Sequence, residues 1–276
     1  MRYGHGFLAL LVLVSCVGTR ATGAASLHCT DALGACLIRE AKSIAENLER
    51  AERRDEAYFA IADALADMGK LEDALAAAEN IDHGTTREEV LGEIAGSAAR
   101  FGHYGQALDI VDGILDSRNR SSRVMALETL AVEQASAGEI DAAFKTVNAI
   151  RNPYRRSQAQ AAIATAVARS GDIPGGIRAA TRVATNYWFT SDQARVKVAS
   201  GLVARSGEFD HFWFYEALAG IAVIQARTGD VMGALQTAKS IPDMTGRSRA
   251  MARVAAVQAE TGDLAGARAT ARRIEA

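Results

Sequence analysis

The sequence predicts an all-α protein, an α-solenoid of stacked antiparallel helix hairpins. Two observations predict this class: glycines recur at a nearly constant spacing, and small and aliphatic residues recur around each glycine at helical intervals. Composition agrees, because the 276 residues are 49% hydrophobic and 23% charged and include only three prolines. Such a composition excludes disordered, collagen-like and disulfide-knot proteins.

Seven glycines define the repeat. They are separated by 33, 36, 33, 36, 22 and 33 residues and are Gly69, Gly102, Gly138, Gly171, Gly207, Gly229 and Gly262. A period of this length is typical of repeat architectures in which each unit is a pair of helices. We number positions within a unit from its glycine.

The residues before each glycine predict a first helix. Position −3 is always alanine, position −7 is alanine or serine, and position −8 is usually a larger aliphatic residue such as Ile61 or Leu130. These offsets lie on one face of an α-helix. The glycine itself is expected to adopt the left-handed conformation that ends such a helix.

The residues after each glycine predict a second helix. A small residue stands at +5 in six units and a β-branched residue at +12, for example Ala74 and Ile81. Asp172, Asp230 and Asp263 directly follow their glycines and can cap the second helix. A single hairpin cannot bury its apolar face, so neighbouring units must stack.

This register resembles the tetratricopeptide repeat (TPR) family over about residues 54–276. In that family a larger apolar residue and a small one stand eight and seven positions before a turn glycine, and alanine stands five after it. The chain departs from the family at −4, where no aromatic residue occurs, at +12, and in lacking a proline at the end of each unit. The resemblance implies a divergent TPR-like solenoid that binds protein or peptide partners, without transferring particular binding residues.

The N-terminus predicts export. Residues 1–25 contain an apolar run, Phe7 to Val14, followed by small residues that suit signal-peptidase cleavage after Ala24 or Ala25. The alternative is a lipoprotein signal, in which cleavage before Cys16 and lipidation of its thiol tether the protein to a membrane. The protein is therefore expected in the bacterial periplasm, outside the cell, or anchored to a membrane surface. Residues 26–37 form a lead-in segment, and the repeat domain covers 38–276, beginning with the second helix of one further unit at 38–49.

Two cysteines lie near the start of the expected mature chain. In an oxidising compartment Cys29 and Cys36 could form a disulfide. On one continuous helix they would be about 10 Å apart, so a bridge requires a turn near Gly34. The alternative is two unpaired thiols.

Aromatic residues concentrate where the repeat is irregular. Only 22 residues separate Gly207 from Gly229, so the second helix after Gly207 is missing. Eight of the 16 aromatic residues lie within 187–215. Candidate partner-binding residues are Tyr187, Trp188, Phe189, Phe212, Trp213 and Tyr215, because aromatic side chains are favoured interface anchors. The alternative is that they form connectors between units and fill the gap.

Charge is unevenly distributed along the chain. Residues 31–150 carry 12 basic and 23 acidic side chains, whereas 151–276 carry 17 and 10. This asymmetry could orient a partner or promote head-to-tail self-association, or it could simply solvate the helices. Nucleic acid is not an expected partner, because the basic half has no dense run of lysine or arginine.

Position −2 carries a second set of candidate partner-binding residues. These are Arg100, Arg169, Arg205 and Arg227, which could bind a carboxylate-bearing peptide or an anionic polymer. The helix dipole alone also favours arginine in a last turn.

The sequence contains no recognisable catalytic or metal-binding pattern. No two of the five histidines are four residues apart, and neither a phosphate-binding loop nor a nucleophile motif occurs. We therefore expect a non-enzymatic exported scaffold for protein or peptide binding, without cofactor. The alternative is an envelope protein that binds a glycan, lipid or cell-wall fragment through the aromatic residues of 187–215.

Overall fold

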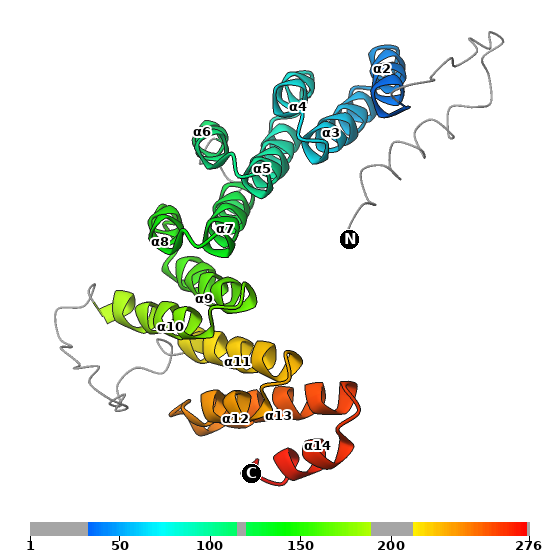
Figure 1. Ribbon diagram of the computed structural model, residues 1–276. Coiled ribbons are helices and arrows are strands. Elements are labelled where there is room, and N and C mark those ends of the chain that lie inside the picture. The colour runs from blue at the N-terminus through cyan, green and yellow to red at the C-terminus, as the bar shows by residue number, and fades with distance from the viewer. Residues whose placement is uncertain (1–32, 115–119, 189–211, 275–276) are drawn as a thin grey trace. The chain divides into compact units, whose positions relative to one another are not determined.

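The protein is all-α across the residues that the structure describes. The computed structural model describes residues 33–114, 120–188 and 212–274, which form thirteen α-helices and no strand (Figure 1). The helices are α2 (Leu33–Glu46), α3 (Ala51–Asp67), α4 (Leu71–Ala78), α5 (Gly84–Arg100), α6 (Tyr104–Gly113), α7 (Arg120–Ser136), α8 (Ile140–Val147), α9 (Pro153–Arg169), α10 (Ile173–Trp188), α11 (Phe212–Arg227), α12 (Val231–Lys239), α13 (Met244–Glu260) and α14 (Leu264–Ala271).

The chain divides into two compact units within α7. Unit 1 comprises residues 1–130 and unit 2 comprises residues 131–276. In unit 1 each first helix packs against the second helix that follows it, α3 on α4 and α5 on α6, and the first helices α3 and α5 pack against each other. Figure 1 shows α4 and α6 on the same side of α3 and α5.

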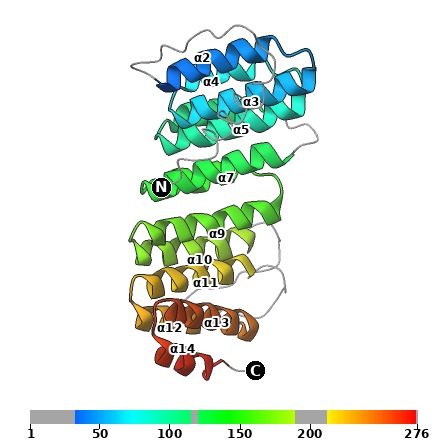
Figure 2. The same ribbon diagram turned by 90° about the vertical axis from the view of Figure 1, so that its right-hand side faces the viewer.

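Unit 2 repeats this arrangement. The hairpins are α9 with α10, α11 with α12 and α13 with α14, and α11 lies between the first helices α9 and α13 and packs against both (Figure 2). First helices from successive hairpins therefore lie side by side. This packing places equivalent positions of two neighbouring first helices close to each other.

The glycines take the backbone conformation that the sequence predicts. Gly69, Gly102, Gly138, Gly171, Gly229 and Gly262 all have φ between 73° and 103°, and Gly207 lies outside the described residues. Asp172, Asp230 and Asp263 accept hydrogen bonds from the backbone N–H three residues on, at 2.7 to 2.8 Å, as expected of N-caps. Both turn predictions are thus confirmed at the described glycines.

The repeated apolar positions form the core. In the described repeats that precede the last one, the residue at −8 is fully buried. These residues are Ile61, Ile94, Leu130, Ile163 and Ile221. The +12 residues from Ile81 to Ile241 are at most 2% exposed. In the last repeat Ala267 at +5 and Ile274 at +12 are only half-buried, because no described helix follows α14.

A buried polar pair replaces apolar packing in three hairpins. The Thr146, Thr237 and Thr270 hydroxyls at +8 donate to the side-chain oxygens of Gln134, Gln225 and Gln258 at −4, at 2.7 to 2.8 Å. Where −4 is apolar, +8 is apolar as well, as in Leu65 with Ala77. Each hairpin therefore carries a matched pair.

The irregular region is partly described. α11, which follows position 207, ends at Arg227, two residues before Gly229. It is therefore a first helix, and it packs directly against α9. Residues 189–211 lie outside the described residues. α10 has 16 residues, whereas the other described second helices of unit 2 have eight or nine.

The N-terminal helix α2 begins at Leu33, within the segment 26–37, and packs against α3. Its buried side chains are Ile38, Ala41 and Ala45. Cys36 in its first turn is disulfide-bonded. Residues 1–25, Cys16 and Cys29 lie outside the described residues.

Candidate binding surface

An arginine at −15 donates to a backbone carbonyl at several junctions between hairpins. The guanidinium of Arg87 donates to the Ile81 carbonyl, with Nε at 2.9 Å, and Arg156 and Arg247 make the same contact with Ile150 and Ile241 at 3.2 and 3.4 Å. These carbonyls lie just after a second helix, where backbone acceptors have no partner within the helix. The arginine role is therefore structural.

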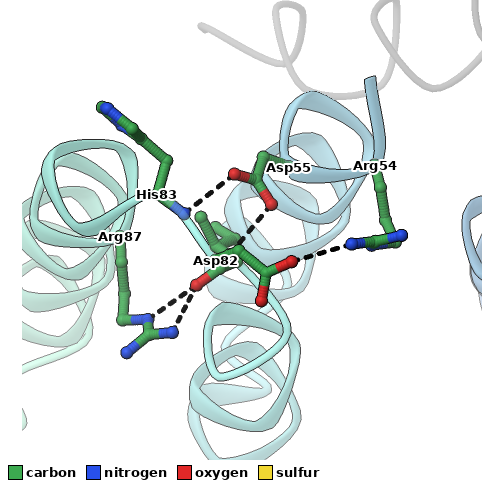
Figure 3. A network of polar contacts seen from close by, with 6 residues as sticks. Arg54, Asp55, Asp82, His83 and Arg87 are labelled. Carbon is green, nitrogen blue, oxygen red and sulfur yellow. Dashed lines mark hydrogen bonds and ion pairs between the residues drawn. The ribbon is translucent and has the colours of Figure 1, made fainter. Parts of the chain in front are cut away.

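Figure 3 shows the network at the first of these junctions. The buried Asp55 carboxylate accepts from the backbone N–H groups of Asp82 and His83, each at 2.9 Å, and Arg54 pairs with Asp82 at 2.7 Å. Arg87 holds the Ile81 carbonyl beside it. The carboxylates of Asp55 and Asp82 and the guanidiniums of Arg54 and Arg87 therefore fix the connection between α4 and α5.

Sequence reasoning missed these arginines, although the signal was present. Arginine occurs fifteen residues before five of the seven glycines, at positions 54, 87, 123, 156 and 247. The small and aliphatic positions that define the repeat lie between −8 and +12, so these arginines fall outside that frame.

One partly exposed face of each first helix lies beside the equivalent face of the neighbouring first helix. This first-helix face comprises positions −13, −9, −6 and −2, whose spacings of four, three and four place them in one stripe. Ion pairs join neighbours at these positions: Asp67 with Arg100 at 3.0 Å, Arg227 with Glu260 at 3.6 Å, and Glu216 with Arg249 at 3.0 Å.

The first-helix face of unit 1 is acidic. On α3 and α5 it carries five carboxylates and one arginine, namely Glu56, Asp63, Asp67, Glu89, Glu93 and Arg100. Burial, and then the charges of Asp67 and Glu93, raise the pKa of Asp63. Two exposed apolar residues, Met68 and Phe101, lie next to this stripe at position −1, and the Phe101 ring covers Gly69.

The first-helix face of unit 2 is basic. On α9, α11 and α13 it carries four arginines and two glutamates, namely Arg169, Arg227, Arg249, Arg253, Glu216 and Glu260. Glu216 is the shared acceptor of Arg249 and Arg253, at 3.0 and 2.9 Å. Within the described part of the chain, no carboxylate pairs with Arg169.

An aromatic cluster adjoins the basic face at the start of α9 and α11. The Trp213 ring lies edge-on to Tyr154 and to Phe212, with centroid distances of 5.3 and 5.0 Å. Arg249 lies 5.9 Å above the Phe212 ring. Tyr154 is 59% exposed and Phe212 is 39% exposed. We call Tyr154, Phe212, Trp213, Glu216, Arg249 and Arg253 the aromatic–arginine ladder.

Two further features of this cluster concern its polar atoms. The Trp213 Nε1–H is buried and has no hydrogen-bond acceptor in the described structure. Burial, and to a smaller extent the Asp243 carboxylate, raise the pKa of Tyr215. The Tyr215 ring packs against the start of α13, 3.4 Å from the position a Gly246 Cβ would take.

The structure brings some of the predicted binding residues together and separates others. Phe212, Trp213 and Tyr215 occupy the first turn of α11, so they are helical residues and not connectors. Tyr187 and Trp188 are the last two residues of α10, whereas Phe189 and Arg205 lie outside the described residues. Arg100 pairs with Asp67 at 3.0 Å, and Arg227 pairs with Glu260 at 3.6 Å.

Tyr154 belongs to this cluster, although it is not among the aromatic residues that the sequence singles out. It stands one residue after the N1 proline of α9, fifty-nine positions before Trp213. Only the packing of α9 against α11 joins the two rings.

Within the described residues, no group of three or more His, Cys, Asp or Glu side chains could hold a metal ion. None of the described helices is long and apolar enough to cross a membrane.

Comparison with known proteins adds little. No protein-family model matches the chain, and no curated protein sequence matches it. The crystal structure of Ton1535 from Thermococcus onnurineus NA1 aligns over 98% of this chain and 86% of its own, with 16% sequence identity and a TM-score of 0.31. At that score the likeness carries no argument about fold or function.

Proposed function

We propose that the protein is an exported, non-enzymatic scaffold, a divergent TPR-like α-solenoid that binds protein or peptide partners. The observation that carries this proposal is the aromatic–arginine ladder, in which side chains from three neighbouring first helices form one partly exposed surface. Aromatic and arginine side chains are the residue types that most often dominate protein interfaces.

The helix arrangement supports the solenoid assignment within each unit. Hairpins follow one another, and successive first helices pack side by side. The buried Ile and Ala positions recur with the period of the glycines. The N-terminal signal predicted from the sequence and the disulfide-bonded Cys36 support export, because disulfides persist in oxidising compartments.

Affinity capture from the native envelope extract tests this proposal. The bait is the tagged exported protein, and its variant is Tyr154→Ser/Phe212→Ser, which alters two exposed side chains. We expect protein partners that mass spectrometry detects with the parent bait and not with the variant.

A matched control separates binding from general loss of apolar surface. Met232→Ser/Leu264→Ser removes two residues that are 71% and 60% exposed and lie outside the ladder. This control should retain the partners, and all baits should keep their helical circular dichroism. If the Tyr154→Ser/Phe212→Ser bait still captures the same partners, the proposed surface is wrong. If the parent bait recovers only glycan or lipid, the proposal of protein binding is wrong.

A further inference from the structure

We infer that the aromatic–arginine ladder of one copy binds the acidic first-helix face of unit 1 in a second copy. This goes beyond the proposed function, because the partner is the chain itself. Charge identifies the occupant. The ladder offers two guanidiniums to a single internal carboxylate, Glu216, and the side chains of Arg249 and Arg253 remain 46% and 42% exposed.

The unit 1 face has the opposite imbalance. Its five carboxylates share one arginine, and that arginine is already paired with Asp67. On this face burial, and then the charges of Asp67 and Glu93, raise the pKa of Asp63. Arginine groups from a second copy would relieve this repulsion, since guanidinium binds carboxylate through two parallel hydrogen bonds.

The two faces also match in their apolar parts. Tyr154 and Phe212 are exposed beside the arginines, and Met68 and Phe101, 40% and 49% exposed, lie beside the carboxylates. Burying these four side chains against each other removes apolar surface from water on both copies. Sulfur and ring edges are favourable contacts for aromatic rings.

The contact is heterologous, because it joins different surfaces of the two copies. A heterologous contact leaves one face of each kind unsatisfied at the ends, so it continues into rings or filaments. The protein should therefore associate as its concentration rises, and salt should weaken the association because both faces are charged.

Sedimentation of the purified exported protein at low and high salt tests the inference. Two variants each remove two charges from one face: Glu89→Gln/Glu93→Gln on α5, and Arg249→Gln/Arg253→Gln on α13. We expect the parent protein to associate at low salt and each variant alone to associate at least about tenfold more weakly, as expected when two charge-assisted contacts are lost.

Mixing the variants gives the decisive result. The glutamate variant keeps its ladder and the arginine variant keeps its acidic face, so an equimolar mixture should form a one-to-one dimer that does not grow further. Arg272→Gln/Arg273→Gln removes the same charge from exposed positions at the end of α14 and should associate like the parent.

Several outcomes would overturn the inference. These are a parent protein that stays monomeric at low salt, a variant that still associates alone, or a mixture that stays monomeric while both variants are folded by circular dichroism. Phe212→Ser, which leaves every ion pair intact, should also weaken association. None of these results bears on partners captured from the envelope, so the proposed function stands or falls separately.

Discussion

At the residue scale, Gly138 offers a clean test of the turn. Its φ is 89°, and nothing lies within 4 Å of the position that a Cβ would take. Gly138→Val therefore changes backbone strain and no contact. We expect a loss of about 1 to 3 kcal/mol in the free energy of unfolding, the usual cost of a strained backbone position. Urea denaturation measures it, and a change within about 0.5 kcal/mol would contradict the left-handed assignment.

Asp63 should destabilise the folded protein at neutral pH. Burial and two neighbouring carboxylates raise its pKa above the ordinary value of 3.8, so the folded state binds its proton more tightly than the unfolded state does. Stability contributed by this group is thus present at low pH and is lost as pH rises from about 3.8 through the raised pKa. We expect Asp63→Asn to raise Tm at pH 7, with a difference that disappears below the unfolded pKa.

Asp263 provides the control of opposite sign. The Gly266 N–H, and then the Gln258 amide, lower its pKa. Its stabilising contribution is present above the unfolded pKa and is lost as pH falls through the lowered pKa. Asp263→Asn should therefore lower Tm at pH 7. If both variants shifted Tm in the same direction, the direction of the pKa shift given for one of the two carboxylates would be wrong.

At the scale of the helices, the repeat frame could be read from the sequence because burial depends on periodicity. The positions of Ile61, Ala62 and Ala66 relative to Gly69 are enough to predict the buried face of α3. Contacts between hairpins were harder to predict. Tyr154 and Trp213 meet only because α9 and α11 are neighbours, although α10 and residues 189–211 separate the two helices in the sequence.

The polar pairs within hairpins show the same limit. Taken alone, Gln225 is a departure from the family pattern at −4. Its structural role depends on Thr237, which lies twelve residues later on the facing helix. Both side chains are buried, so each needs the other for its hydrogen bond. The pattern was present in the sequence, but only the hairpin geometry shows why the two residues must change together.

A double-mutant cycle at this pair follows from that geometry. Thr237→Ala leaves the Gln225 side-chain oxygen without its buried donor, and Gln225→Leu leaves the Thr237 hydroxyl without its acceptor, so each single change should cost about 1 to 3 kcal/mol. The double variant recreates the apolar pair of Leu65 and Ala77. It should lose clearly less stability than the sum of the two single variants in urea denaturation. Additive losses would mean that the two side chains do not act as a pair.

At the scale of the whole molecule, the opposed charges of the two halves acquire a structural location. The acidic excess of residues 31–150 includes the first-helix face of unit 1, and the basic excess of 151–276 includes that of unit 2. The charge count could be made from the sequence. The sequence does not show which of these charges are neutralised, because the ion pairs of Arg100 and Arg227 depend on which helices pack side by side.

The disulfide at Cys36 connects the proposed export of the protein to helix α2. The chain has three cysteines, and Cys36 is disulfide-bonded. If the bridge joins Cys29 to Cys36, one of the two alternatives that the sequence leaves open for an exported chain, then Cys29→Ser should leave one thiol that reacts with a maleimide reagent in the exported protein. Cys16→Ser should leave no reactive thiol at Cys36, because cleavage removes Cys16 or lipidation consumes its thiol. A reactive Cys36 in the Cys16 variant would contradict the predicted pairing, and intact mass spectrometry of the parent protein would show whether the mature chain begins at Cys16 or near Ser26.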